Sequence, residues 1–235
     1  LIMRKFFTLI LGLMFFVVAT AQDRPEGTIM RTGVDLPVID GMLDESGAWD
    51  SAVVYNIDKG LYGEEYTFGD PEETTWRALW NEDGMYIYVT TVDDEWLPSY
   101  ISGGNSWEYD KPEVYFDVNY VLIDGLGPAT GSSGHHQVAP AAEQDKIDGT
   151  PVTQDNGVVY AFFVEDPNWS VEYFVPWSLL QTADGGMFDQ TAPMGFDVTM
   201  IDRDTDDSGR RRAVWANVGG VNESWSNMDD VGYIY

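Results

Sequence analysis

The stretch that decides the fold reads TTWRALW at residues 74–80, NEDG at 81–84 and MYIYVTTV at 85–92. The outer two segments are rich in β-branched and aromatic residues, and the segment between them is a polar turn sequence that ends in glycine. This pattern predicts a β-hairpin whose turn places Gly84 in the left-handed region.

Strand-like runs of the same kind recur along the chain, each bounded by Gly, Asp or Asn. They predict further strands at 113–121, 157–164, 170–175, 195–201, 212–216 and 232–235. Amphipathic helical periodicity is nearly absent, and residues 176–180 predict one short helical turn with Pro176 at its first position. The sequence therefore predicts an all-β protein, an antiparallel β-sandwich of the jelly-roll or immunoglobulin-like two-sheet kind.

Residues 113–119 alternate between polar and apolar side chains. Because successive side chains of a strand face opposite sides, Val114, Phe116 and Val118 are expected to point into the core. The opposite face then carries Glu113, Tyr115, Asp117 and Asn119. That polar face is either a solvated outer surface or a binding surface.

Composition excludes several classes of function. The 235 residues include 12 Lys and Arg against 40 Asp and Glu, which gives a formal net charge of −28, and they include two His and no Cys. Such a negative charge would repel nucleic acid and anionic membrane surfaces, so neither is expected as a partner. The absence of Cys excludes disulfides, thiol catalysis and iron–sulfur clusters.

The N-terminal residues have the features of a secretory signal peptide. Arg4 and Lys5 precede an apolar run at 6–18, and Ala19-Thr20-Ala21 is a small-x-small cleavage signal. We expect residues 1–21 to be a signal peptide, 22–32 a flexible lead and 33–235 one domain. The mature protein is expected to be exported to the periplasm or secreted, without membrane insertion after cleavage.

Three tryptophans, Trp96, Trp107 and Trp225, lie in polar, turn-rich segments. An exposed indole beside amides and carboxylates can stack on the C–H face of a pyranose while the polar groups bind its hydroxyls. The alternative is that each loop folds back and caps the sandwich, an alternative that weighs most for Trp96. The tryptophans expected in the core are Trp49, Trp76, Trp80, Trp177 and Trp215.

Asp202, Asp204 and Asp206 have the alternate spacing of a calcium-binding loop. The segment is not an EF-hand, because glycine comes at its eighth position and Ala213 stands at the twelfth. A looser structural Ca²⁺ site remains open, and the alternative is an acidic hairpin tip balanced by Arg210, Arg211 and Arg212. No organic cofactor is expected. His135 and His136 are adjacent, so on an extended strand they cannot share a metal.

Several motifs resemble family 9 carbohydrate-binding modules. They are PVIDGMLDE at 37–45 followed by Trp49, WEYDKPEVYFD at 107–117, VEYFVPW at 171–177 and NESW at 222–225. The resemblance spans residues 37–235. It implies a β-sandwich that binds oligosaccharides or polysaccharides without catalysis, in polysaccharide recognition or degradation, and that carries structural calcium.

The resemblance also assigns residues. The two rings that hold the sugar in the family fall on Trp107 and Trp225, and its pocket carboxylate and amide fall on Glu113 and Asn222. Gln137 stands where the family has Arg, and Thr199 where it has Gln. Because an amide offers fewer donors than a guanidinium, the sugar or the end of the chain that is recognised can differ.

Two other functions stay open at this point. Similar sandwiches hold b-type haem, which here would need Met194 or Met200 with His135 or His136 as axial ligands. A glycoside-active enzyme or an accessory subunit of one would need paired carboxylates, which 40 acidic residues supply in abundance.

Overall fold

The computed structural model describes residues 24–43, 47–64, 73–98, 106–119, 121–131, 134–141, 146–148, 157–205, 209–219 and 223–235. The predicted signal peptide at 1–21 lies outside these residues. No helix within them has the length and apolar character needed to cross a lipid bilayer.

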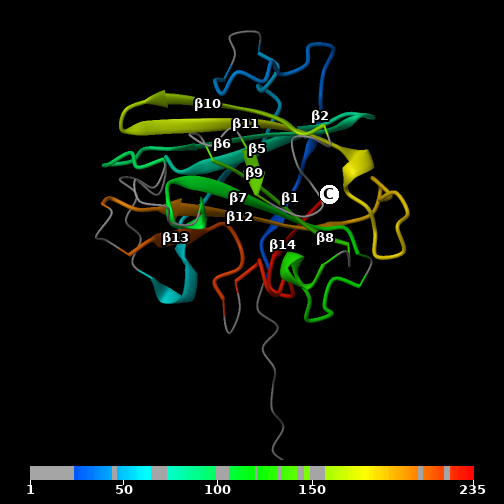
Figure 1. The fold of residues 1–235 in the computed structure, drawn as a ribbon. Helices are drawn as coiled ribbons and strands as arrows, with labels where there is room; N and C mark the ends of the chain where they lie inside the picture. Colours follow the sequence, from blue (N-terminus) through cyan, green and yellow to red (C-terminus); the bar gives the residue numbers. More distant parts are fainter. Residues whose placement is uncertain are drawn as a thin grey trace, which may run out of the picture.

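Two β-sheets face each other in two layers (Figure 1). The eight-stranded sheet has the strand order β1-β14-β12-β7-β8-β9, and β13 pairs with β12 and with β4. Its strands are β1 (Glu26–Gly27), β4 (Lys59–Gly60), β7 (Lys111–Asp117), β8 (His135–Ala141), β9 (Lys146–Asp148), β12 (Met194–Asp202), β13 (Arg211–Val214) and β14 (Gly232–Ile234).

The six-stranded sheet has the order β10-β11-β6-β5-β2, and β3 pairs with β5. Its strands are β2 (Met30–Arg31), β3 (Val54–Asn56), β5 (Thr75–Trp80), β6 (Gly84–Thr91), β10 (Val159–Glu165) and β11 (Asn168–Pro176). All pairings are antiparallel except β1 with β14 and β2 with β5. The predicted all-β sandwich is therefore confirmed.

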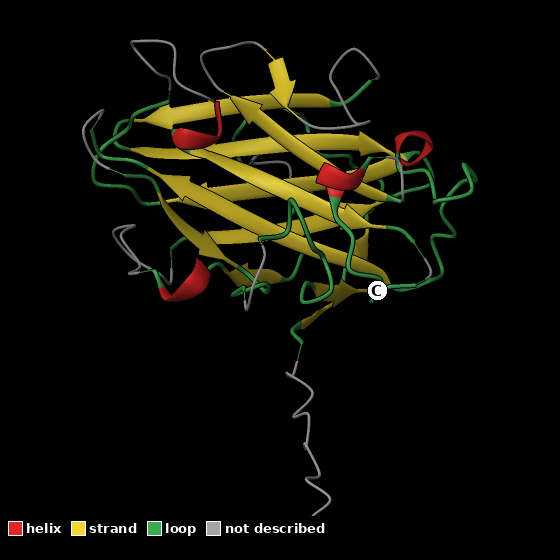
Figure 2. Ribbon diagram, turned by 60° about the horizontal axis from the view of Figure 1, so that its bottom comes forward, coloured by secondary structure: helices red, strands yellow, loops and turns green. Residues whose placement is uncertain are grey.

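Helical structure within the described residues is limited to short 3₁₀ turns, which are red in Figure 2. These are η1 (Leu61–Gly63), η2 (Ser106–Glu108), η3 (Pro128–Thr130) and η5 (Trp177–Leu179). The turn expected at 176–180 is η5, but Pro176 is its N-cap residue rather than its first residue. The other three turns were not predicted.

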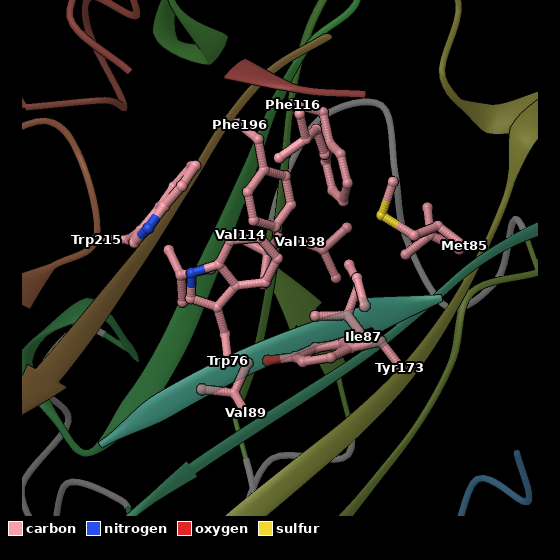
Figure 3. Packing of buried hydrophobic residues seen from close by; sticks show 14 of the residues in the cluster. Trp76, Met85, Ile87, Val89, Val114, Phe116, Val138, Tyr173, Phe196 and Trp215 are labelled. Atoms are coloured by element: carbon pink, nitrogen blue, oxygen red, sulfur yellow. The ribbon is translucent and has the colours of Figure 1, made fainter. Parts of the chain in front are cut away.

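Side chains from both sheets fill the space between the layers (Figure 3). Trp76 of β5 packs against Phe196 of β12 and against Trp215, with ring centroids 4.7 and 4.9 Å apart. Val114 and Phe116 of β7 also lie in this core, as the alternation predicted. Trp49, Trp177 and Trp215 are buried as expected, and Trp80 and Trp96 are partly buried against other core residues.

The predicted hairpin forms between β5 and β6, with Trp80 opposite Met85. The reason given for its glycine is wrong, because Gly84 does not have a positive φ. Glycine is needed there for space, since a Cβ at this position would lie 2.5 Å from the carbonyl oxygen of Val175. The Asn81 side chain closes the turn by accepting hydrogen bonds from the backbone of Asp83 and Gly84.

Other boundaries differ from the sequence-based expectation. Residues 22–32 do not form an unstructured lead throughout, because β1 pairs with β14 and β2 with β5. Strand β7 ends at Asp117 rather than at residue 121. At this end of the strand the Asp117 carboxylate accepts a hydrogen bond from the backbone N–H of Asn119. Strand β8 was not predicted; it is where His135 and His136 lie.

Candidate functional site

The polar face of β7 is covered rather than solvated. Glu113, Tyr115 and Asp117 are all buried, and Met228 and Val231 pack against the Tyr115 ring. These two residues belong to the segment that leads into β14. The interpretation of this face as a solvated outer surface is therefore wrong.

A cavity of about 430 Å³ opens on this face of the sheet. Its volume lies within the range of small-molecule binding sites. The cavity is lined by Trp107, Lys111, Glu113, Tyr115, Gln137, Arg210, Glu223 and Trp225. Four of the six ligand-binding residues predicted from the sequence are among them.

Tryptophans from two distant segments contribute to the wall. Trp107 lies in η2, just before β7, and the residue is 47% exposed. Trp225 lies in the turn that precedes β14 and is 37% exposed. The exposed fractions show that neither tryptophan is buried in the core.

A chain of hydrogen bonds runs across the adjacent strands β7 and β8. Gln137 lies opposite Tyr115 in the strand register. The Gln137 amide donates to the Tyr115 hydroxyl at 2.9 Å, and that hydroxyl donates to Glu113 Oε2 at 2.7 Å. Burial, together with the neighbouring Glu113 carboxylate, raises the pKa of the Tyr115 phenol well above its ordinary value. The phenol therefore stays protonated and orients both neighbours.

Charged groups of both signs line the same cavity. The Lys111 ammonium is buried, and its nitrogen lies 3.8 Å from Glu113 Oε1. An Arg210 guanidinium nitrogen lies 3.8 Å from Glu223 Oε2. Together the lining residues offer carboxylate acceptors, cationic donors and two aromatic faces. This combination suits a ligand that carries hydroxyls on an otherwise apolar ring.

Buried hydrogen bonds attach the turn that carries Trp225 to strand β12 of the eight-stranded sheet. Ser224 is buried, and its hydroxyl donates to Asp197 Oδ2 at 2.9 Å. The Asn217 amide donates to the Ser224 hydroxyl at 3.1 Å. Burial raises the pKa of Asp197 to about 6 despite three backbone N–H donors and Ser224. These bonds hold the backbone next to Trp225 against β12.

Of the remaining two predicted ligand-binding residues, Thr199 is not among the described residues that line the cavity. Thr199 belongs to β12, lies opposite Glu113 in the strand register and is buried. Asn222 lies outside the described residues. Sequence reasoning missed Lys111, Tyr115, Arg210 and Glu223 as lining residues, although the alternation along 113–119 already put Tyr115 on the face of Glu113.

Of the three acids of the predicted calcium loop, the structure describes Asp202 and Asp204. Asp202 is buried, Asp204 is exposed, and Asp206 lies outside the described residues. Asp202 lies close to Asp93 and Asp110, and one carboxylate oxygen from each of the three lies within 4.8 Å of the others. All three are buried, and burial raises the pKa of Asp93 to about 7 and of Asp110 to about 9. Oxygen ligands at this spacing fit a hard divalent cation.

The residues considered for haem ligation lie elsewhere. Met194 and Met200 belong to the hydrophobic core. His136 Nε2 lies 2.8 Å from the carbonyl oxygen of Gln181, whereas His135 faces Asp117 and Asp124. None of the four is among the residues that line the cavity in the described part of the chain.

A family model for the carbohydrate family 9 binding domain-like group matches residues 39–235. The chain belongs to this family. No curated relative matches the sequence significantly. A family 9 module from Caldicellulosiruptor kristjanssonii, solved with cellotriose, is similar to this chain with a TM-score of 0.62 and 14% identity, covering 89% of this chain and 92% of the other.

Two further solved structures share the fold of this family 9 domain. The Caldicellulosiruptor kristjanssonii module in complex with glucose gives a TM-score of 0.64 at 14% identity and covers 89% of this chain and 94% of the other. A putative carbohydrate-binding protein from Bacteroides uniformis gives 0.58 at 11% identity and covers 90% of this chain and 98% of the other. These similarities agree with the family 9 fold of this chain.

Proposed function

We propose that this protein binds carbohydrate without catalysis and that its cavity holds a sugar ring between Trp107 and Trp225. The observation that carries this proposal is that two partly exposed indoles, distant in sequence, line one cavity with buried hydrogen-bonding groups. The family match and the ligands of the two Caldicellulosiruptor structures support the carbohydrate class. The function would be the recognition of a polysaccharide or oligosaccharide during its degradation.

The physical reason lies in the two surfaces of a sugar. The axial C–H groups of a pyranose form an apolar face that packs on an indole, a contact that contributes about 1 kcal/mol beyond the burial of area. The hydroxyls at its rim need donors and acceptors that keep their geometry after water leaves. Glu113 and Gln137 are proposed for this role, and their shared partner Tyr115 holds them in place.

The choice of sugar is the finer part of the proposal. Cellotriose and glucose are the ligands of the similar structures, so glucose-configured sugars are the first candidates. Gln137 offers two donors and one acceptor where the family pocket has a guanidinium. We propose that Asn222 and Thr199, the other two ligand-binding residues predicted from the sequence, affect which hydroxyls of the sugar are contacted.

We propose that the chain acts after export, as the signal-like residues 1–21 predict. We also propose that a structural calcium ion is held by Asp93, Asp110 and Asp202 rather than by the hairpin that contains Asp204 and Asp206. The close approach of three buried carboxylates supports this ligand set. The cation would neutralise their mutual repulsion.

Isothermal titration calorimetry tests the proposal. The purified mature chain is titrated with glucose, cellobiose, cellotriose and xylo-oligosaccharides, and the same titrations are run on Trp107→Ala and Trp225→Ala. Each substitution is expected to weaken binding at least about fivefold, since it removes one stacking contact of about 1 kcal/mol or more. Phe163→Ala, which truncates an exposed aromatic residue of the other sheet, is the matched control.

Two results would overturn the proposal. One is the absence of binding to every sugar by the intact wild-type chain, and the other is full binding by both tryptophan variants. Release of reducing sugar from a polysaccharide panel, abolished by Glu113→Gln, would replace it with a glycoside-active enzyme.

A further inference from the structure

Two arginines of the basic cluster Arg210-Arg211-Arg212 pair with glutamates that lie outside the neighbouring acidic hairpin. Arg212 forms ion pairs with Glu64, at 2.7 Å, and with Glu223. Arg210 also faces Glu223, whereas Arg211 is exposed at the surface. Two of the three arginines are therefore directed at the residue that begins the Trp225 turn.

Arg210 contacts both tryptophan-bearing segments. Its Nη1 donates to the backbone carbonyl oxygen of Trp107 at 2.6 Å, and its Nη2 lies 3.8 Å from Glu223 Oε2. The backbone carbonyl of Glu223 in turn accepts the N–H groups of Ser226 and Asn227 at 2.9 and 3.0 Å. Glu223 thus belongs to the same turn as Trp225, and Arg210 connects this turn to the backbone of Trp107.

Arg210 connects segments that lie next to β7 and β14, two strands that do not pair with each other. In the eight-stranded sheet, β12 pairs on one side with β7, which follows Trp107, and on the other with β13 and β14. The two tryptophan segments therefore leave the sheet from different strands. A planar guanidinium with five donors can engage a carbonyl and a carboxylate at once, whereas an ammonium is a compact point charge.

We propose that Arg210 is a positioning residue which, through Trp107 O and Glu223, sets the separation of the two tryptophan-bearing segments and so the thickness of ring that the cavity accepts. This inference rests on the proposed function for its effect on ligand choice. The bracing itself is a property of the ligand-free protein. The two parts can therefore be tested separately.

The first measurement needs no sugar. The protein is labelled with 5-fluorotryptophan, and the ¹⁹F resonances of Trp107 and Trp225 are assigned from Trp107→Phe and Trp225→Phe. In Arg210→Ala both resonances are expected to shift or broaden while those of the buried tryptophans stay in place. Arg211→Ala, a neighbouring and exposed arginine, is the matched control and is expected to leave both resonances unchanged.

The second measurement is the affinity for cellotriose and glucose by calorimetry. Arg210→Ala is expected to weaken binding about tenfold, and Arg211→Ala is expected to leave it unchanged. Arg210→Lys is expected to weaken binding nearly as much as Arg210→Ala, because lysine keeps the positive charge but lacks the planar set of donors that a guanidinium offers. A double-mutant cycle with Glu223→Gln separates bracing from direct contact. Bracing predicts that Arg210→Ala loses most of its effect once Glu223 is neutralised, whereas a guanidinium that only touches the sugar gives additive effects.

Unchanged ¹⁹F resonances in Arg210→Ala, or additive effects in the cycle, would overturn the inference. If the resonances change but the wild-type chain binds no sugar, the brace stands and the proposed function fails. If sugar binds and the resonances do not change, the proposed function stands and the brace fails. Thermal unfolding of each variant confirms that it is folded at the temperature of the titration.

Discussion

The Tyr115 hydroxyl lies 2.7 Å from Glu113 Oε2 and donates to it, while the Gln137 amide donates to the same hydroxyl from the adjacent strand. One phenol thus orients an acceptor and a donor that line the cavity. Tyr115→Phe removes this link and leaves two buried polar groups without that partner.

We expect Tyr115→Phe to lower the free energy of unfolding by about 1–2 kcal/mol, the usual cost of a lost buried hydrogen bond. Sugar affinity is expected to fall several-fold, because Glu113 and Gln137 lose their fixed orientation. Urea denaturation and calorimetry measure the two effects. Tyr235→Phe, at an exposed residue, is the control, and an affinity in Tyr115→Phe equal to that of the control would contradict the role assigned to the hydroxyl.

Gly127 lies against the backbone of the Trp225 turn. A Cβ at this position would lie 2.8 Å from the carbonyl oxygen of Trp225 and from the carbonyl carbon of Ser226. We expect Gly127→Ala to push the turn outward, to lower stability by about 1–3 kcal/mol and to weaken sugar binding about tenfold. Gly33→Ala, where the added methyl meets open space, is the control. Unaltered binding by Gly127→Ala would show that the position of the turn does not matter.

His136 makes stability depend on acid pH. Burial lowers its pKa to about 4, below the unfolded value of about 6.5. A lowered pKa stabilises the folded state above pH 6.5, and this contribution is lost as the pH falls from 6.5 towards 4. We expect the wild type to lose about 2–3 kcal/mol relative to His136→Phe between pH 7 and pH 4.5.

Chemical denaturation of both proteins at the two pH values measures that difference. Other groups that titrate in this range are present in both proteins, so their contributions cancel. The same difference in unfolding free energy at pH 7 and pH 4.5 would exclude His136 as the cause.

The proposed calcium site predicts a response to metal removal. Saturating Ca²⁺ is expected to raise the unfolding free energy by about 1–3 kcal/mol over EDTA-treated protein, because it binds only the folded state. Asp110→Asn is expected to remove most of this increment, and Asp204→Asn to retain it. Differential scanning calorimetry in Ca²⁺ and in EDTA measures the increments. The reverse pattern would place the ion at the hairpin.

Local pattern in the sequence determined the fold class and one face of the site. Alternation along 113–119 placed Val114 and Phe116 in the core and Glu113 with Tyr115 on the other face, because the side-chain period of a strand is a local property. Polar, turn-rich surroundings likewise identified Trp107 and Trp225 as candidates before any geometry was known.

Tertiary structure decided what covers that face and which distant groups meet there. Met228 and Val231 pack on Tyr115, and Arg210 reaches Trp107 O and Glu223, since strand order brings these loops together. Asp202 likewise lies beside Asp93 and Asp110, which are distant from it in the sequence. No local period encodes such contacts, because they depend on which strands pair across the sheet and on how the loops between them fold back.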